Sequence, residues 1–339
     1  MRAATLRLLL LAAVFLACLP CCLSNSSDDE QHVPLGELAL GVRHVNETIK
    51  RAARAYSMVM LSYADKQVLG SMFPLFLASL NLRPELRHIQ ESLIVVVPTS
   101  EDLDFCMRLH STCHLDYHAE IPLVEVPENI ETAHWQGMKT ARASWRRVDY
   151  VNHILSMDIG VIMMDLDMLV LGNPFSLLRD PEYSDQDVFA QADGRTYDET
   201  VLSGLLNMGF CYFRPTQATK DLVAIWTLGR TRWDQGYLQQ LLREKTVPHL
   251  QWKPVAYNLT YNLCHVSVGT STEYVPNKDE LSPNIFYPEF FQYLVRNKDH
   301  MRYLLTFHTN CCNQFPTVFS CKSMLLHLAL DAVLESEKA

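Results

Sequence analysis

The sequence predicts an α/β fold in which helices flank a mostly parallel sheet. Short apolar runs rich in Val, Ile and Met alternate along the chain with longer segments of helical periodicity, as in proteins of this class. Polar residues follow the apolar runs directly, which is typical of the carboxyl ends of buried parallel strands. The chain has 339 residues, of which 48% are hydrophobic and only 12 are glycine, so we expect a sizeable core.

The N-terminal part of the sheet is predicted from two strands and the segments beside them. Residues 56–65 (YSMVMLSYAD) and 91–99 (ESLIVVVPT) are apolar and end in polar residues, as buried strands do. Residues 66–89, between them, have helical spacing. A third strand is expected at 122–127 (PLVEVP), and helical periodicity extends over 134–158.

The rest of the chain continues the alternation. A further strand leads into Asp165, and the other elements that we expect are strands at 187–193 and 208–215, helices at 217–229 and 234–245, and an apolar helix from Lys322. Ligands of open α/β sheets bind outside the carboxyl ends of the strands. The polar residues just after each apolar run are therefore the candidates for a site.

The N-terminus has the layout of a secretory signal. Two arginines precede an apolar run from Leu8 to Leu23, which is shorter than the roughly 20 residues that span a bilayer. Residues 1–24 are interpreted as a signal peptide or a short signal anchor, residues 25–45 as a flexible stem, and residues 46–339 as the folded domain. The net charge of −9 and the pI near 5.8 argue against a general nucleic-acid binder.

Cysteines and sequons also indicate the secretory pathway. Three N-x-S/T triplets begin at Asn25, Asn46 and Asn258. Cys106 and Cys113 are the first candidates for a local disulfide bond. The cysteines beyond the signal number seven, so an oxidising compartment would leave at least one free or intermolecular thiol, and a disulfide-linked dimer is permitted: Cys106, Cys113, Cys211, Cys264, Cys311, Cys312 and Cys321.

Asp165 and Asp167 are the first candidates for chemistry. They stand two apart in GVIMMDLDMLVLGNPF (residues 160–175), at the end of a predicted strand, where alternation would put both side chains on one face. Two carboxylates on one face repel each other unless a cation or proton lies between them. They would suit Mn²⁺ or Mg²⁺, which takes one or two carboxylates and completes its shell with water and phosphate oxygens. A strand end with two solvated carboxylates is the alternative.

The same stretch resembles the D-x-D strand of nucleotide-diphospho-sugar transferases, especially the group that contains plant arabinosyl- and xylosyltransferases. Further motifs follow in the family's order over residues 55–325: AQADG, LLNMGFCYFRPT, RWDQGYLQQLL and FHTNCCNQFPTVFSCK. A basic residue of the family's preceding helix corresponds to Arg146 or Arg147. The chain departs from the family where a tryptophan is replaced by Leu169 or Val170 and an asparagine is replaced around residues 238–240.

The resemblance implies a GT-A fold, a single Rossmann-like domain, and a glycosyltransferase of the hexosyl or pentosyl type. Such an enzyme would move a sugar from a nucleotide-diphosphate donor, with UDP-sugars expected first, to a hydroxyl of a glycan or glycoprotein, with retention of configuration favoured. It would work in the Golgi lumen, either free or as a type II membrane protein, or be secreted. A non-catalytic nucleotide- or glycan-binding protein on this scaffold and a nucleotide-sugar hydrolase remain alternatives.

The resemblance also implies roles for individual residues. The metal ligands would be Asp165, Asp167 and His308, although a histidine packed in an aromatic region is the alternative for the last. Asp234 is the first candidate for a catalytic carboxylate, Asp193 the second, and Gln235 accompanies them. Asp234 could equally be a helix N-terminal residue, and Asp193 a turn residue. The expected substrate-binding residues are Tyr63, Asp65, Arg147, Asn207, Gly209, Asn310 and Lys322.

Overall fold

The computed structural model describes residues 45–116, 138–192, 206–255, 260–262, 304–309 and 318–336. Within these residues the main sheet consists of β1 (Met58–Tyr63), β2 (Leu93–Val97), β3 (Cys113–Leu115), β4 (Gly160–Met164), β6 (Val188–Ala192), β7 (Leu206–Phe213) and β8 (Trp252–Val255). Their order in the sheet is β3-β2-β1-β4-β7-β6-β8. β7 runs antiparallel to both of its neighbours, and the other pairs are parallel. The predicted α/β class with a mostly parallel sheet is confirmed.

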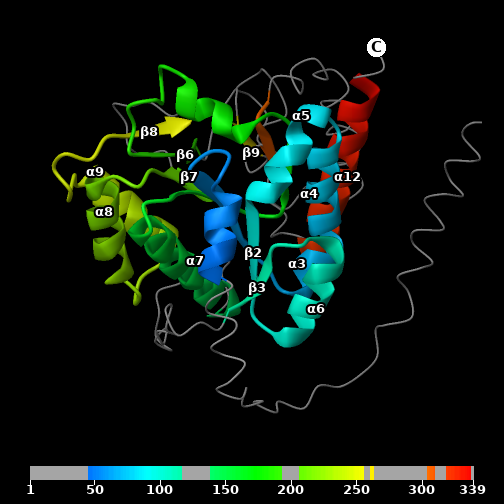
Figure 1. Ribbon diagram of the computed structural model, residues 1–339, viewed down its shortest axis with the longest axis horizontal. Coiled ribbons are helices and arrows are strands. Elements are labelled where there is room, and N and C mark those ends of the chain that lie inside the picture. The colour runs from blue at the N-terminus through cyan, green and yellow to red at the C-terminus, as the bar shows by residue number, and fades with distance from the viewer. Residues whose placement is uncertain are drawn as a thin grey trace, which may run out of the picture. The chain divides into compact units, whose positions relative to one another are not determined.

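The strands are apolar on both sides because helices cover both faces of the sheet. In β4, Val161 and Met163 belong to one core cluster, and Ile162 and Met164 to the other, as the two-residue period of a strand requires. Figure 1 shows α7 (Met138–Ser156), α8 (Gln217–Thr227) and α9 (Asp234–Arg243) on one face. The opposite face carries α3 (Lys66–Ser71), α4 (Phe73–Asn81) and α6 (Ser100–Leu109).

A second, smaller sheet lies beside the first. It is formed by β5 (Met168–Val170), β9 (Thr260–Asn262) and β10 (Thr306–His308), in the order β5-β10-β9. The last helix, α12 (Val318–Ser336), packs with α4 and this sheet through an apolar cluster that includes Leu325, Leu326 and Phe307. The small sheet therefore brings the C-terminal part of the chain next to the end of β4.

Two predicted elements differ from the structure in detail. The helical segment 66–89 is divided into α3, α4, α5 (Pro84–Arg87) and the 3₁₀ helix η1 (His88–Ser92); Pro74 and Pro84 stand in the first turns of α4 and α5, where proline is tolerated. The final helix begins at Val318, ahead of Lys322. A further 3₁₀ helix, η2 (Pro174–Arg179), follows β5.

The third strand was not anticipated where it occurs. β3 contains only three residues, which is too short for a periodicity signal, and it pairs in parallel with β2. The strand expected at 122–127 lies outside the described residues, as do the signal segment and the stem. The predicted bond between Cys106 and Cys113 is confirmed, and it ties α6 to β3. Among the described helices, none is both long and apolar enough to cross a membrane.

Candidate active site

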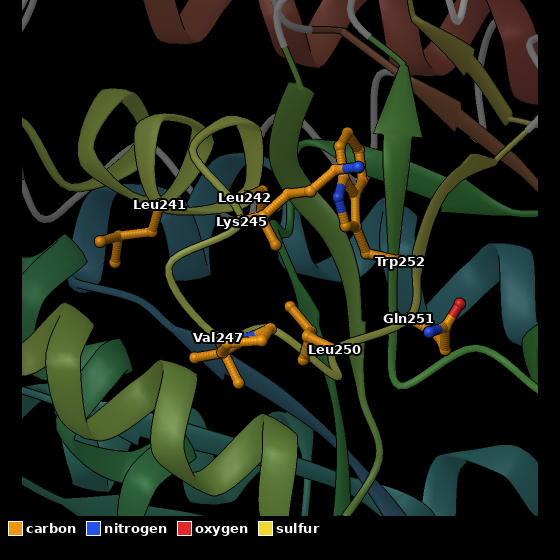
Figure 2. Close-up of a pocket in the computed structure, with 8 residues that line it drawn as sticks. Leu241, Leu242, Lys245, Val247, Leu250, Gln251 and Trp252 are labelled. Atoms are coloured by element: carbon orange, nitrogen blue, oxygen red, sulfur yellow. The ribbon is translucent and has the colours of Figure 1, made fainter.

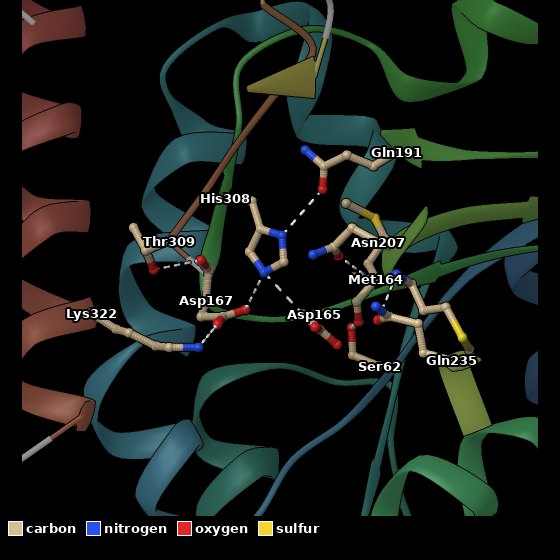
Figure 3. Close-up of polar contacts among 12 residues, drawn as sticks. Ser62, Met164, Asp165, Asp167, Gln191, Asn207, Gln235, His308, Thr309 and Lys322 are labelled. Atoms are coloured by element: carbon tan, nitrogen blue, oxygen red, sulfur yellow. Dashed lines mark hydrogen bonds and ion pairs between the residues drawn. The ribbon is translucent and has the colours of Figure 1, made fainter. Parts of the chain in front are cut away.

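The site residues gather where the carboxyl ends of the parallel strands meet. β4 ends at Met164, whose carbonyl oxygen accepts a hydrogen bond from Ser62 Oγ of the neighbouring β1 at 2.9 Å. The next backbone N–H, that of Asp165, donates to the carbonyl oxygen of Gly209 in β7 at 2.8 Å. Both neighbours of β4 therefore hold the chain at the point where the first aspartate leaves the sheet (Figure 3).

The expectation that Asp165 and Asp167 share one face of a strand is wrong. They lie in the connection between β4 and β5, where no strand alternation applies. Thr309 holds this connection instead: its backbone N–H and its Oγ1 donate to the carbonyl oxygen of Asp167 at 3.0 and 2.8 Å. The side chains converge because backbone hydrogen bonds to β7 and to the end of β10 fix the loop.

His308 joins the aspartates through strand pairing. It is paired with Met168 in the antiparallel register of β10 and β5, and its side chain is 1% exposed. Its Nε2 lies 3.1 Å from Asp167 Oδ1 and 3.8 Å from Asp165 Oδ2. One possible ligand atom from each of the three residues lies within 4.8 Å of the others, so the predicted ligands come together. Figure 3 shows the His308 ring between Gln191 and the two carboxylates.

Two cations hold the carboxylate oxygens of Asp165 and Asp167 that point away from His308, which we call the outer oxygens. Arg147 of α7 forms an ion pair with Asp165 Oδ1, and Lys322 of α12 forms one with Asp167 Oδ2. The inner oxygens, Asp165 Oδ2 and Asp167 Oδ1, are the ones that face His308 Nε2. Each carboxylate is thus anchored on one side and presents an acceptor on the other.

The ion pairs keep the carboxylate of Asp167 charged. Burial by itself would raise the pKa of Asp167, but Lys322 and His308 outweigh burial and hold that pKa far below its usual range. Burial likewise opposes the charge of Arg147, whereas Asp165 and Asp234 raise its pKa above the usual value. Asp167 is therefore available as an anionic ligand throughout the neutral pH range.

The chemistry of this set of atoms fits a divalent cation. Two carboxylate oxygens and one imidazole nitrogen are ligands that Mn²⁺ accepts, and an ion bound by two carboxylates keeps positions for water and phosphate oxygens. Asp165 and Asp167 balance Arg147 and Lys322 in charge, and Asp234 is a further carboxylate that interacts with Arg147. A bound divalent cation would therefore supply the excess positive charge at this position.

Gly209 is required by the packing of the cluster. A Cβ at this position would stand 2.8 Å from Asp165 Oδ2 and 2.9 Å from Asn207 Oδ1, and it would overlap the ring of His308. Asn207 is 3% exposed, and its Oδ1 accepts from the backbone N–H of Gly209 at 2.7 Å. Gly209, expected among the substrate-binding residues, therefore lies in close contact with Asp165 and His308, two of the candidate metal ligands.

Asp234 and Gln235 begin α9 on the β7 side of the cluster. Asp234 is in the first turn of the helix and only 4% exposed, and its carbonyl oxygen accepts from Trp226 Nε1 at 3.0 Å. The expected helix N-terminal position is thus confirmed, and a catalytic role is compatible with it. Gln235 Oε1 accepts from the backbone N–H of Met208 at 3.4 Å, which ties the helix to β7 (Figure 3).

Two of the residues expected to bind the substrate, Tyr63 and Asp65, already have protein partners. Asp65 caps α3 by accepting from the backbone N–H groups of Gln67 and Val68. Tyr63, at the end of β1, donates from its hydroxyl to Asp116 Oδ2 at 3.0 Å. Burial and the Asp116 carboxylate raise the pKa of Tyr63 far above its usual value, so it is a neutral hydrogen-bond donor.

Some site residues were missed or could not be placed. Gln191, fully buried at the end of β6, lies 3.2 Å from His308 Nδ1 through its Oε1. Its sequence signal was available, because it is the one amide in the apolar run VFAQA. Asp116, the partner of Tyr63, was also missed, and no feature of the sequence around it marks it out. Asp193 and Asn310 lie outside the described residues.

A cavity of about 270 Å³ lies elsewhere, between the end of α9 and β8 (Figure 2). Trp252, one of its lining residues, pairs with Val188 at the start of β6, whereas Gln191 stands near the end of that strand. The cavity thus lies near the N-terminal end of β6, whereas the aspartates lie at the carboxyl ends of the parallel strands. None of the predicted site residues lines it; its walls are Leu241, Leu242, Lys245, Val247, Pro248, Leu250, Gln251 and Trp252.

The chain was compared with protein families and with curated proteins. Residues 88–316 match the model of a family described as nucleotide-diphospho-sugar transferase. The matched range includes both aspartates and His308, but not Lys322. Among curated proteins the comparison finds no match.

Two solved structures are similar to the chain. Mouse xyloside xylosyltransferase 1 in its apo form is 13% identical, with a TM-score of 0.43, over 76% of this chain and 99% of that one. A glycosyltransferase involved in glycosylating the major capsid of PBCV-1 is 8% identical, with a TM-score of 0.40, over 80% of this chain and 98% of that one.

Proposed function

This chain belongs to the nucleotide-diphospho-sugar transferase family, and from that premise we propose a metal-dependent glycosyltransferase that moves a sugar from a nucleotide-diphosphate donor to a hydroxyl of a glycan or glycoprotein. The enzyme class is that of a glycosyltransferase. To this enzyme class the proposal adds a bound metal ion, Mn²⁺ or Mg²⁺, and a UDP-sugar as the first donor to test. It also adds the acceptor class and retention of configuration.

One observation carries the metal proposal. The inner oxygens of Asp165 and Asp167 face the Nε2 of His308, while Arg147 and Lys322 are paired with the outer oxygens. Two carboxylate oxygens that converge on one imidazole nitrogen are held there either by a proton on that nitrogen or by a cation among the three atoms. Asp165, Asp167 and His308 would hold the ion, which as a Lewis acid would neutralise charge on the diphosphate leaving group.

Lys322 and Arg147 supply fixed positive charge beside this position. Cleavage of a sugar–phosphate bond increases the negative charge on the diphosphate, and preorganised cations stabilise that charge more in the transition state than in the ground state. Both cations are mostly buried, with 14% and 12% of their side chains exposed, so solvent screens them weakly. Their ion pairs hold them in place before the donor arrives.

Asp234 and Gln235 are proposed to lie at the sugar. Asp234 is a buried carboxylate in the first turn of α9, and Arg147 interacts electrostatically with both Asp234 and Asp165. With retention, a carboxylate nucleophile would attack the anomeric carbon, or the acceptor would enter on the face that the diphosphate leaves. An Asp234→Asn variant that retains more than a tenth of wild-type kcat would exclude the first route.

The disulfide bond supports the proposed location. A bond between Cys106 and Cys113 is expected in an oxidising compartment. Together with the N-terminal apolar run, it favours the secretory pathway, and the reaction type favours the Golgi lumen. Immunofluorescence of the tagged full-length protein against a Golgi marker tests this, and a cytosolic pattern would reject it.

Donor binding is the first test of the proposed function. The full-length protein is titrated with a panel of nucleotide sugars, with and without Mn²⁺, while its melting temperature is recorded. A ligand at about 100 times its Kd should stabilise the native state by about 2.7 kcal/mol. We expect one nucleotide class to raise the melting temperature only with Mn²⁺, and Asp167→Asn to abolish the rise.

The control replaces an exposed aspartate of α6, Asp104→Asn, which should leave the rise unchanged. Free sugar released at the same rate with and without acceptors would instead identify a hydrolase. A well-folded protein that binds no nucleotide sugar would overturn the proposal in favour of a binding protein for other ligands.

A further inference from the structure

We propose that Gln191 is a positioning residue of the metal site, which fixes the tautomer and the orientation of His308. Its amide oxygen accepts a hydrogen bond from His308 Nδ1–H, so that the Nε2 lone pair points between Asp165 and Asp167. The inference rests on the proposed function, because it concerns a residue behind a metal ligand. It assigns a role to a buried side chain that the reaction itself does not use.

The position of Gln191 is unusual for a strand of the core. It is fully buried near the end of β6, among the apolar residues of VFAQA. Burying an amide is costly unless it has hydrogen-bond partners. The partner in the site is His308, whose Nδ1 lies 3.2 Å from Gln191 Oε1 and whose side chain is 1% exposed.

A local irregularity of the sheet accompanies this contact. Ala190 of β6 pairs with Cys211 of β7, but the next residue, Gln191, pairs with Asn207, so the register shifts between them. Such bulges redirect the side chains that follow them and are frequent beside active sites. The same shift sets Gln191 opposite Asn207, which is hydrogen-bonded to Gly209 beside the aspartates.

Donor and acceptor chemistry then determines the tautomer. A neutral imidazole has one N–H donor and one acceptor nitrogen. Because Gln191 Oε1 can only accept, it keeps the proton of a neutral imidazole on Nδ1 and leaves the Nε2 lone pair for an ion; Nε2 lies 3.1 Å from Asp167 Oδ1 and 3.8 Å from Asp165 Oδ2. Partners behind a metal-bound histidine commonly fix its tautomer and raise its basicity in this way.

The test measures Mn²⁺ binding to the full-length protein after chelation, without any donor. Gln191→Met keeps the length of the side chain and removes the acceptor, so Mn²⁺ affinity should fall by about 10- to 100-fold. Gln191→Glu restores an acceptor on Nδ1 and should bind Mn²⁺ at least as tightly as the wild type. Electron spin-echo envelope modulation should show nitrogen coupled to Mn²⁺ in the wild type and the Glu variant, and weakly or not at all in the Met variant.

The matched control is a substitution of Thr306, which lies on the same strand as His308. Thr306 is fully buried in β10, and its Oγ1 is without a hydrogen-bond partner among the described residues. Thr306→Val therefore changes the packing near His308 without changing the chemistry at Nδ1, and it should leave Mn²⁺ affinity and the nitrogen coupling unchanged. If Gln191→Met does not fold, Gln191→Asn, whose shorter side chain withdraws the amide from Nδ1, takes its place.

The outcomes separate this inference from the proposed function. Mn²⁺ affinity within twofold of wild type in Gln191→Met, with binding lost in Asp167→Asn, would overturn the role of Gln191 and leave the metal proposal intact. Equal loss of affinity in Gln191→Met and Gln191→Glu would also overturn it, since a shared loss indicates a packing effect. A wild-type protein that binds no Mn²⁺ would reject both.

Discussion

Arg146 and Arg147 are neighbours in α7, yet they belong to two different groups of charges. Arg146 is 5% exposed and joins a network that we call the internal network: Asp116, Arg146, Asp149 and Arg230. Arg147 belongs to the metal cluster of Asp165, Asp167, His308, Arg147 and Lys322. Successive helical residues point about 100° apart, so one side chain faces the interior between elements and the other faces the site.

The two groups differ in how their carboxylate oxygens are used. In the internal network every oxygen has a fixed donor: Asp116 accepts from Arg146 and Tyr63, and Asp149 accepts from Arg146 and Arg230. In the metal cluster the outer oxygens are paired with Arg147 and Lys322, and the inner oxygens converge on the imidazole nitrogen of His308. Charges that are all matched by fixed partners serve the fold, whereas converging acceptors indicate a place for a ligand.

The largest effect should follow from removing the negative charge of Asp167. Asp167→Asn replaces a carboxylate that contacts both His308 and Lys322 with a neutral amide. We expect kcat/KM to fall by about 10³, since removing one preorganised stabilising group costs on the order of 10²–10³, while the far-UV circular dichroism spectrum stays unchanged. Asp104→Asn is the control. Activity retained within tenfold would make the metal cluster a structural feature like the internal network.

A substitution in the internal network should reduce stability and leave activity nearly unchanged, the opposite of the result expected for Asp167. Arg146→Met leaves Asp116 and Asp149 buried with too few donors, and breaking such a pair costs about 3–5 kcal/mol of unfolding free energy. Urea unfolding should show this loss, and the specific activity of the folded fraction should stay within about threefold of wild type. Arg142→Met, an exposed position of the same helix, controls for the change in helix charge. A large loss of kcat without a loss of stability would place Arg146 in the active site.

Gly209→Ala tests how closely the metal cluster is packed. The added Cβ would contact Asp165 Oδ2 and overlap the His308 ring. Overpacking typically costs about 1–3 kcal/mol, and displacement of a ligand should weaken Mn²⁺ binding by roughly 10-fold or more. Isothermal titration calorimetry measures the binding. Gly70→Ala, where the nearest atom is 3.9 Å away, should leave binding unchanged; equal affinities in the two variants would show that the cluster can expand.

The smallest expected effect is the dependence of the unfolding free energy on pH in the acid range. The pKa of Asp167 is lowered in the folded protein, so its ion pairs stabilise the fold above its unfolded pKa, near 3.8, and this stabilisation is lost as the pH falls through the lower folded value. The stability difference between wild type and Asp167→Asn in urea should therefore be constant from about pH 7 to pH 5 and shrink below about pH 4. A difference that shrinks between pH 7 and pH 5 would contradict the lowered pKa.

Much of the fold was predictable because its signals are local. The runs that become β1, β2, β4, β6 and β7 are apolar over several residues, and the helices between them have regular spacing. β3 was missed because three residues carry no period. The two aspartates of D-x-D lie together with His308 as expected, but the strand geometry expected for them was wrong, since backbone hydrogen bonds to β7 and from Thr309 hold them in a loop.

The sequence by itself determined the α/β alternation, the pair of aspartates and the disulfide bond, because each depends on residues close together in the chain. His308, which is 141 residues from Asp167, was expected beside it only through the family resemblance, and the tertiary structure shows how strand pairing brings it there. Only the tertiary structure decided that Arg147 rather than Arg146 reaches Asp165 and that Gln191 lies behind the imidazole. These contacts depend on sheet register and helix rotation. Neither is encoded in a local pattern, because both arise when distant elements pack together.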